Sequence, residues 1–308
     1  MGVSLLHYRP WRGRFHGTGM SVWPIARIAL WMIVRRKIFW GLYAMGLLIF
    51  FMFFFGQYLL AWAQTQISEE TIRVGLRRVE PQWLIQTLRD VLKLNGSAET
   101  YRNFFWYQGR MVIILQALAG SILVGNDFQF GCLPFYLSKP PGRWQYLLGK
   151  CLAVAVFINL MTTVPAMILF VQYGLLDSWS YFTESSRLLA GIAGYGLLLT
   201  VCLSLMLVAA AVCLRRTVPL IITWAALFFL FPLLARFMVD RLQYDSHWML
   251  IDLWNDMYVL GNCFLGVQHE SLGPRQPVVY QAALVVGVTS LLCLIYLNLR
   301  IRAIEVVK

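Results

Sequence analysis

Residues 38–63 read "IFWGLYAMGLLIFFMFFFGQYLLAWA", a run that contains no charged side chain and a single amide, Gln57. A helix rises about 1.5 Å per residue, so this run is long enough to cross the roughly 30 Å of hydrocarbon in a bilayer. The tripeptide Ala61-Trp62-Ala63 looks like a signal-peptide cleavage site, but the apolar run before it is too long for a signal peptide. The stretch therefore predicts an uncleaved membrane-spanning helix.

The rest of the chain has the same character. Of its 308 residues, 59% are hydrophobic and 13% are charged, whereas soluble domains have about 25% charged residues. We therefore predict an all-α integral membrane protein with six transmembrane helices, in which an N-terminal segment (1–37) precedes a six-span domain (38–308). The predicted spans are Ile38–Ala63, Phe104–Gly125, Leu147–Tyr173, Leu188–Cys213, Val218–Phe237 and Val278–Leu299.

Basic residues orient the predicted bundle, because the cytoplasmic loops of membrane proteins carry an excess of lysine and arginine. An even number of spans puts both termini on one side. That side holds fifteen of the 26 basic residues but only two of the 14 acidic residues. We expect it to be the cytoplasmic side of a cell's inner membrane, with outer loops at 64–103 and 238–277. This asymmetry accounts for the net charge of +12 without nucleic acid as a partner.

Three segments outside the spans have helical patterns. Residues 21–37 end in three bases and predict a helix lying in the inner headgroup layer, with an inward extension of the first span as the alternative. Residues 83–96 indicate a short amphipathic helix outside the membrane. Residues 247–267 are apolar but interrupted by polar residues and glycine between Asp252 and Gly261. This pattern favours a re-entrant or interface-lying helical hairpin over an extramembrane cap with its own small core.

No pattern in the sequence predicts an active site or a cofactor site. Gly149-Lys150 resembles the end of a phosphate-binding loop, but the preceding glycine is Gly142 and Cys151 replaces the hydroxyl residue, so we expect no ATP site here. The six cysteines form no CxxC motif and the four histidines have no metal-ligand spacing, so neither a metal nor a disulfide is implied. We expect a protein without cofactors that is not itself an enzyme.

The connection between the second and third predicted spans is the most distinctive stretch of the chain. Residues 126–150 read "NDFQFGCLPFYLSKPPGRWQYLLGK". Asn126 can cap a helix, the helix dipole favours Asp127 in the first turn, and Pro140-Pro141-Gly142 ends the helix. A short helix that projects aromatic side chains from the inner face suits the docking of another protein. Burial among lipid headgroups is the alternative.

This stretch resembles the signature of the membrane-spanning subunits of type-2, exporter-like ABC transporter permeases. The residues that match the family pattern are Asp127, Gly131, Ser138, Lys139, Pro140, Arg143, Leu147, Leu148, Gly149 and Lys150. The resemblance extends to the six-span layout, the basic helix before the first span and the polar outer loops. Cys132-Leu133-Pro134 departs from the pattern, because the family more often has a helix-friendly run there.

The resemblance implies that this segment is a coupling helix that fits a groove on a separate ATP-binding cassette ATPase subunit. It also implies a homodimer or heterodimer of permeases in the lipid bilayer, whose spans rock between inward-open and outward-open or collapsed states when the ATPases bind ATP. The residues expected to make the ATPase contact are Asp127, Phe128, Phe130, Gly131, Leu133, Phe135, Lys139 and Arg143.

Polar side chains inside the spans are costly in hydrocarbon and are therefore candidates for a translocation path. Arg110 either faces a central cavity, where it would meet an anionic substrate, or snorkels to the outer interface. Asn159, Thr162 and Thr163, with Pro165, either kink the third span and line a path or make ordinary hydrogen bonds within the bundle.

Small residues gather on the fourth predicted span. Gly191, Gly194 and Gly196 recur on one stretch of it, together with Ala190 and Ala193. Small side chains let helix backbones approach closely in membranes, so we predict tight helix packing along this face.

Two functions suit such a chain. The favoured one is the permease subunit of an ATP-driven transporter, with a lipid-like or amphipathic cargo suited to its aromatic-rich spans. The alternative is an ATP-independent membrane scaffold or assembly subunit that retains the permease fold. A membrane enzyme is disfavoured, because no cluster of catalytic residues is visible in the sequence.

Overall fold

The structure is a computed structural model that describes most of the chain outside its two ends and several connections. The described residues are 21–66, 73–74, 77–78, 93–120, 143–214, 216–268, 272–273 and 275–300. In this part of the chain, five helices are long and apolar enough to span a membrane: Lys37–Trp62, Trp144–Leu176, Ser186–Leu214, Thr217–Arg241 and Val279–Arg300. The prediction of an all-α, multi-pass membrane protein is therefore confirmed.

The elements follow one another along the chain with few strands. In order they are α1 (Val22–Val34), α2 (Lys37–Gln66), β1 (Arg73–Val74), β2 (Arg77–Arg78), α4 (Ala98–Gly120), α7 (Arg143–Met161), α8 (Thr163–Leu176), α9 (Ser180–Glu184), α10 (Ser186–Leu214), α11 (Thr217–Ala225), the π-helix η3 (Ala226–Leu230), α12 (Phe231–Arg236), the π-helix η4 (Phe237–Arg241), the 3-10 helix η5 (Ser246–Ile251), α13 (Leu253–Leu265) and α14 (Val279–Arg300). The two strands form one short antiparallel ladder.

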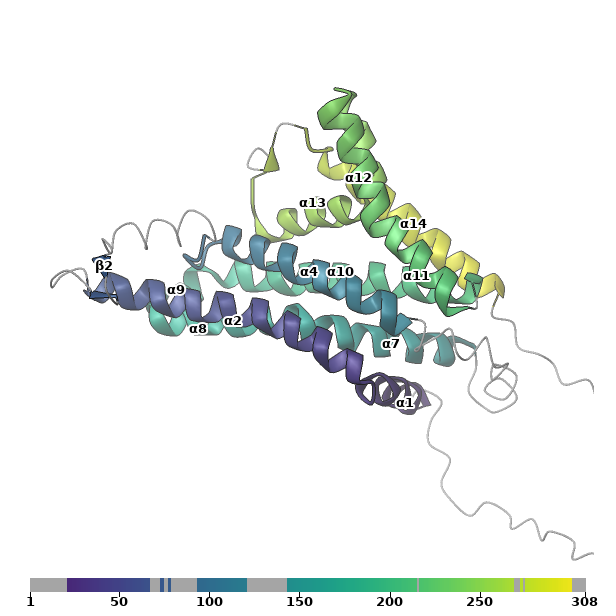
Figure 1. Cartoon of the computed structure of the whole chain (residues 1–308), viewed down its shortest axis with the longest axis horizontal. Helices are drawn as coiled ribbons and strands as arrows, with labels where there is room; N and C mark the ends of the chain where they lie inside the picture. Colours follow the sequence, from purple (N-terminus) through teal and green to yellow (C-terminus); the bar gives the residue numbers. More distant parts are fainter. Residues whose placement is uncertain are drawn as a thin grey trace, which may run out of the picture.

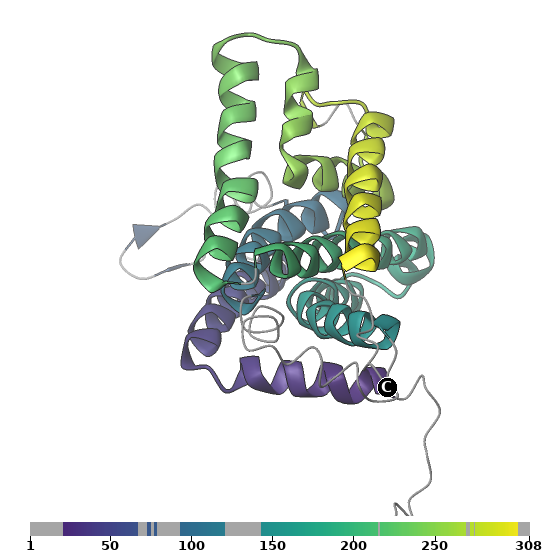
Figure 2. The same cartoon turned by 90° about the vertical axis from the view of Figure 1, so that its right-hand side faces the viewer.

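The helices form a bundle with a second group inclined to it. Helices α2, α4, α7, α8 and α10 pack together, whereas α11, α12 and α14 are inclined to them and α13 lies between the two groups (Figures 1 and 2). The start of α2, the turn between α10 and α11 and the end of α14 all lie at one end of the bundle (Figure 1). Helix α4, which covers most of the remaining predicted span, runs through the bundle between α2 and α10.

Helix α1 is separate from α2 and crosses the end of the bundle. Two residues, Arg35 and Arg36, separate it from α2. Trp40 Nε1 donates a hydrogen bond to Val34 O at 2.9 Å across this elbow between the helices. Figure 2 shows α1 lying crosswise beneath the bundle helices. It packs on α7 at Gly149, where a Cβ would lie only 2.8 Å from Ile25 Cβ. The N-terminal segment is therefore a distinct helix and not an inward extension of the first span.

The third predicted span consists of two helices. Helix α7 ends at Met161 and α8 begins at Thr163, with Thr162 between them at φ −115° and ψ −68°. Pro165 has no N–H to donate to the carbonyl of Met161, so one bond of the helical ladder is missing at this point. The helix is therefore interrupted where the kink was predicted, just before the proline.

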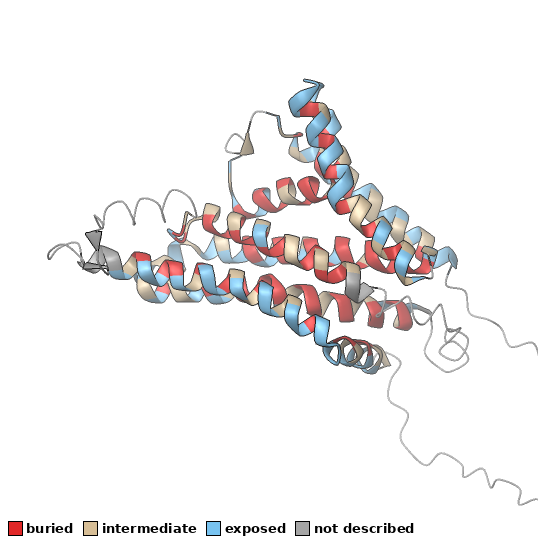
Figure 3. Ribbon diagram, in the orientation of Figure 1, coloured by how far each residue is buried: buried red, intermediate tan, exposed pale blue. Residues whose placement is uncertain are grey.

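The last loop, predicted to lie on the outer side, folds back into the protein as η5 and α13. Asp252 separates these helices and caps α13, because its Oδ1 accepts a hydrogen bond from Asn255 N at 3.0 Å. The helix ends at Gly266, whose φ of +76° is left-handed and suits glycine. Most of α13 is buried (Figure 3), and its apolar residues belong to the main core. A separate small cluster, Ala235, Val239 and Met249, lies beside η5. The small separate core expected for the alternative, an extramembrane cap, is therefore found beside η5, whereas α13 packs into the main core.

Glycines allow α13 to lie close to α10, which confirms the tight packing predicted for the fourth span. A Cβ at Gly191 would run into the carbonyl of Phe264, and one at Gly194 would lie 3.2 Å from the Phe264 ring. A Cβ at Gly196 would meet Thr163 of α8. From the α13 side, Gly261 lies against the ring of Tyr195. Residues 79–92, which hold most of the predicted outer amphipathic helix, lie outside the described residues.

Candidate functional site

The polar residues predicted for the third span make hydrogen bonds within the bundle. Asn159 Nδ2 donates to Ala155 O and to Thr200 Oγ1 of α10, both at 2.8 Å. Thr162 Oγ1 donates to Ile158 O at 2.9 Å and lies 3.5 Å from Thr163 Oγ1. These bonds pair the Asn159 amide nitrogen and the Thr162 hydroxyl within the bundle and tie α7 to α10. A role for Asn159, Thr162 and Thr163 in a translocation path stays a prediction.

Arg110 crosses from α4 to the inclined helices. Its side chain is half-buried, and Nη1 donates to Phe228 O of η3 at 3.4 Å. The guanidinium lies over the Trp106 ring, 4.7 Å from its centroid, and 5.7 Å from the centroid of Trp254 on α13. Arg110 of α4 therefore contacts η3 through Phe228 and lies beside α13 at Trp254.

The carbonyl that Arg110 reaches lacks its α-helical donor because of a proline. In an α-helix, Phe228 O would accept from the N–H of the residue at position 232, which is Pro232 and has none. The chain forms the π-helical turn η3 just before this proline, and π-helical turns often occur at functional sites. Arg110 donates to Phe228 O at this break.

A second arginine and a buried acid complete this cluster. Arg236 of α12 lies over the same Trp106 ring at 5.8 Å, and its side chain is exposed. Asp252 is fully buried, and both guanidiniums act on it electrostatically. Burial raises the pKa of Asp252, whereas the hydrogen bond from Asn255 N and the two arginines lower it. We call Trp106, Arg110, Arg236, Asp252 and Trp254 the Arg110 cluster.

The Arg110 cluster carries more positive than negative charge. No salt bridge joins Arg110 or Arg236 to an acid within the described residues. Two guanidiniums with donors to spare, flanked by indole rings, suit a phosphate or carboxylate on an otherwise apolar molecule. Trp254 is held against α4 at Gly109, where a Cβ would overlap its ring. This close contact fixes the position of Trp254 relative to α4.

Arg110 was predicted from the sequence, but its neighbours in the cluster were not predicted to lie near it. Pro232 within an apolar run indicates that Phe228 O lacks its α-helical donor, but the sequence does not show which helix lies opposite this carbonyl. Arg236 and Asp252 lie on different helices, and only the fold brings them near Arg110.

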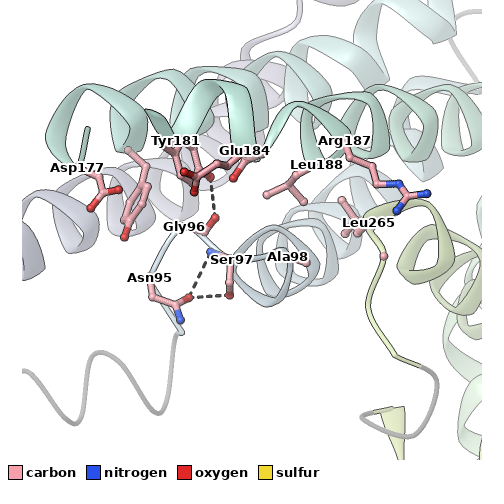
Figure 4. Close-up of a pocket in the computed structure, with 13 residues that line it drawn as sticks. Asn95, Gly96, Ser97, Ala98, Asp177, Tyr181, Glu184, Arg187, Leu188 and Leu265 are labelled. Carbon is pink, nitrogen blue, oxygen red and sulfur yellow. Dashed lines mark hydrogen bonds between the residues drawn. The ribbon is translucent and has the colours of Figure 1, made fainter. Parts of the chain in front are cut away.

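A polar recess lies at the opposite end of the bundle from α1. Its volume is about 420 Å³, and it is formed by the start of α4, the α8–α9 connection, the start of α10 and the end of α13 (Figure 4). Tyr181 Oη donates to Gly96 O at 2.7 Å and lies 3.3 Å from Tyr101 Oη. Burial raises the pKa of Tyr181 to about 12, so the phenol is neutral and donates. None of the predicted site residues lines this recess.

The predicted ATPase contact falls outside the described residues. This applies to Asp127, Phe128, Phe130, Gly131, Leu133, Phe135 and Lys139. Arg143 is the first residue of α7, so the predicted segment leads directly into that helix.

A comparison with known protein families finds no family model that matches this chain, and a comparison with curated proteins finds no relative.

Proposed function

We propose that this chain is the membrane-spanning permease subunit of an ATP-binding-cassette transporter. Separate ATPase subunits bind and hydrolyse ATP, so the chain itself is not an enzyme. It crosses the inner membrane six times, with α4 as the second span and both termini in the cytoplasm. Two permease subunits, identical or different, pair in the bilayer, and α13 is a re-entrant helix in the last outer loop.

The observation that carries this proposal is the place where the motif segment joins the fold. Residues 126–150 follow α4 and include the first part of α7, from Arg143 on, and their last two residues lie where α1 crosses α7. At Gly149 the two helices approach closely, and the adjacent Lys150 is buried, with Nζ 5.7 Å from the Tyr146 ring. A push on the segment from an ATPase would therefore reach α7 and α1 together. Rigid, packed helices transmit such a displacement, because a close-packed contact cannot absorb it.

The Arg110 cluster supports an amphipathic cargo with an anionic group. It lies where α4, α12 and α13 meet, at the boundary between the bundle and the inclined helices. Movement of these two groups relative to each other would expose or close this boundary. An acidic headgroup would contact the guanidiniums while the apolar part remained among the helices.

The alternative is a membrane scaffold or assembly subunit that keeps the permease fold without transporting. The extensive hydrogen bonding of Asn159 and Thr162 inside the bundle is compatible with such a static role.

Purification from native membranes separates the two functions. A tagged chain should be isolated in mild detergent and the co-purifying proteins quantified. The transporter function predicts an ATP-binding subunit in equal amount and ATP hydrolysis by the purified complex. Stable association with another complex, without any ATPase, would support the scaffold function instead.

A further inference from the structure

Asp256 on α13 is a carboxylate enclosed by the protein. Its side chain is fully buried, and neither Oδ1 nor Oδ2 has a hydrogen-bond partner among the described residues. Asp252 lies one helical turn earlier and is also fully buried. Asp252 differs in that its Oδ1 caps α13, which leaves only Oδ2 without a partner in the same part of the chain.

The charges around α13 face Asp252 and not Asp256. Among the described residues, Arg110 of α4 and Arg236 of α12 act on Asp252, whereas the only charge that acts on Asp256 is that of Asp252, which repels it. Other titratable groups around α13 interact with other residues. Arg102 and Glu99 of α4 act on Tyr258, and Tyr195 of α10 stacks on Phe105 and also acts on Tyr258. His247 of η5 pairs with Asp245, and Tyr280 of α14 accepts from Gln281, while η3 carries no titratable side chain.

An ionised carboxylate in this position would be unstable. It would have lost its hydration without gaining a hydrogen bond or a counter-ion, which is far more costly than burying the neutral acid. A metal ion is a poor replacement for the lost water here, because the described residues contain no group of three or more potential ligands. The neutral, protonated acid needs neither.

We propose that Asp256 is a proton-binding site, whose carboxyl group holds a proton while α13 is docked and releases it when α13 separates from α4 and α10. Burial, together with the smaller effect of repulsion by Asp252, raises the pKa of Asp256 to about 8. Docking of α13 is therefore coupled to the binding of one proton, and loss of that proton favours separation. The inference goes beyond the transporter function and does not depend on it.

The sign of the pH effect follows from linkage. An aspartate in the unfolded chain titrates near 3.8, so between that pH and about 8 the folded protein holds a proton that the unfolded chain has lost. The stabilisation is complete below the lower value and is lost as the pH rises towards the upper one. Within this window the equilibrium constant for unfolding rises about tenfold per pH unit on account of Asp256. In Asp256→Asn this contribution is absent.

The test compares unfolding of the purified protein in detergent across about pH 5 to pH 8. Wild type, Asp256→Asn and the exposed control Asp177→Asn should be measured in parallel. The ratio of the wild-type unfolding constant to that of Asp256→Asn should rise about tenfold per pH unit, whereas the ratio of wild type to Asp177→Asn should stay nearly constant. Parallel pH profiles for wild type and Asp256→Asn would overturn the proposal.

Infrared spectroscopy detects the same proton in the wild-type protein, and two variants then assign the band to a residue. Wild-type protein at neutral pH should show the carbonyl stretch of a protonated carboxylic acid, and the band should disappear as the pH rises past about 8. Asp252→Asn should retain the band, and Asp256→Asn should lose it. A wild-type protein without this band at neutral pH has an ionised Asp256, which would contradict the proposal.

Discussion

Replacing Gly191 by alanine tests the docking of α13 on α10. The added Cβ would overlap the carbonyl oxygen of Phe264 and lie 3.0 Å from its carbonyl carbon. Both are backbone atoms near the end of α13, so the neighbour cannot rotate away and the helix itself must shift. Overpacking of this kind costs about 1 to 3 kcal/mol, and a rigid backbone neighbour puts the value near the upper end. The gain in helix propensity from glycine to alanine offsets at most about 1 kcal/mol.

Gly287→Ala on α14 is the matched control, because nothing lies within 4 Å of a Cβ at that position. The same substitution there changes only helix propensity, so it should leave the stability unchanged or raise it by up to about 1 kcal/mol. Gly191→Ala should therefore be less stable than Gly287→Ala by about 2 to 3 kcal/mol, or more than about thirtyfold in the unfolding equilibrium. Unfolding in detergent, followed by the fluorescence of the buried tryptophans, measures the difference. Equal stabilities for the two variants would refute the described contact between α10 and α13.

Three further predictions concern other contacts. Arg110→Gln should alter transport or substrate-stimulated ATPase activity at a near-normal level of assembled protein. Arg110→Lys should keep only part of the wild-type activity, because lysine lacks the planar fork of donors. Unchanged activity in both variants would favour the snorkelling position. Single cysteines at Leu250 and Leu260, with Cys263 replaced, should react slowly with a membrane-impermeant maleimide, and rapid labelling of both would favour an exposed cap. Trp40→Phe removes the hydrogen bond to Val34 O and should cost about 0.5 to 1.5 kcal/mol of stability, whereas Trp23→Phe, on the exposed part of α1, should cost less.

The spans were predictable from the sequence because their signal is local. A run of apolar residues long enough to cross a bilayer identifies a helix without knowledge of its neighbours, as residues 38–63 illustrate. The interruption of the third predicted span was also predictable, because Pro165 removes a hydrogen bond from its own helix. The separation of α1 from α2 was predictable as well, since three consecutive basic residues mark its position.

The contacts between helices could be predicted only in part. The glycines of α10 indicated close packing, but their partner, the α13 backbone at Phe264, could not be identified from spacing. Asp252 and Asp256 interrupted an apolar run and were interpreted as breaks, yet only Asp252 separates two helices. Asp256 lies within α13, where a protonated acid is compatible with an apolar environment. This distinction depends on burial and partners, which a single sequence does not show.

The most direct test of the proposed function is whether the segment before α7 holds the ATPase subunits. Burying a phenylalanine side chain in a partner is worth about 1.5 to 3 kcal/mol, so losing two such contacts should weaken binding by a factor on the order of a hundred or more. Co-purification should be measured for wild type, Phe128→Ala with Phe130→Ala, and Asp127→Asn, whose dipole contact is worth only about 0.3 to 1 kcal/mol. The double variant should insert and pair normally but lose its ATPase subunits, while Asp127→Asn should largely keep them. A double variant that retains the ATPase at wild-type stoichiometry and activity would contradict it.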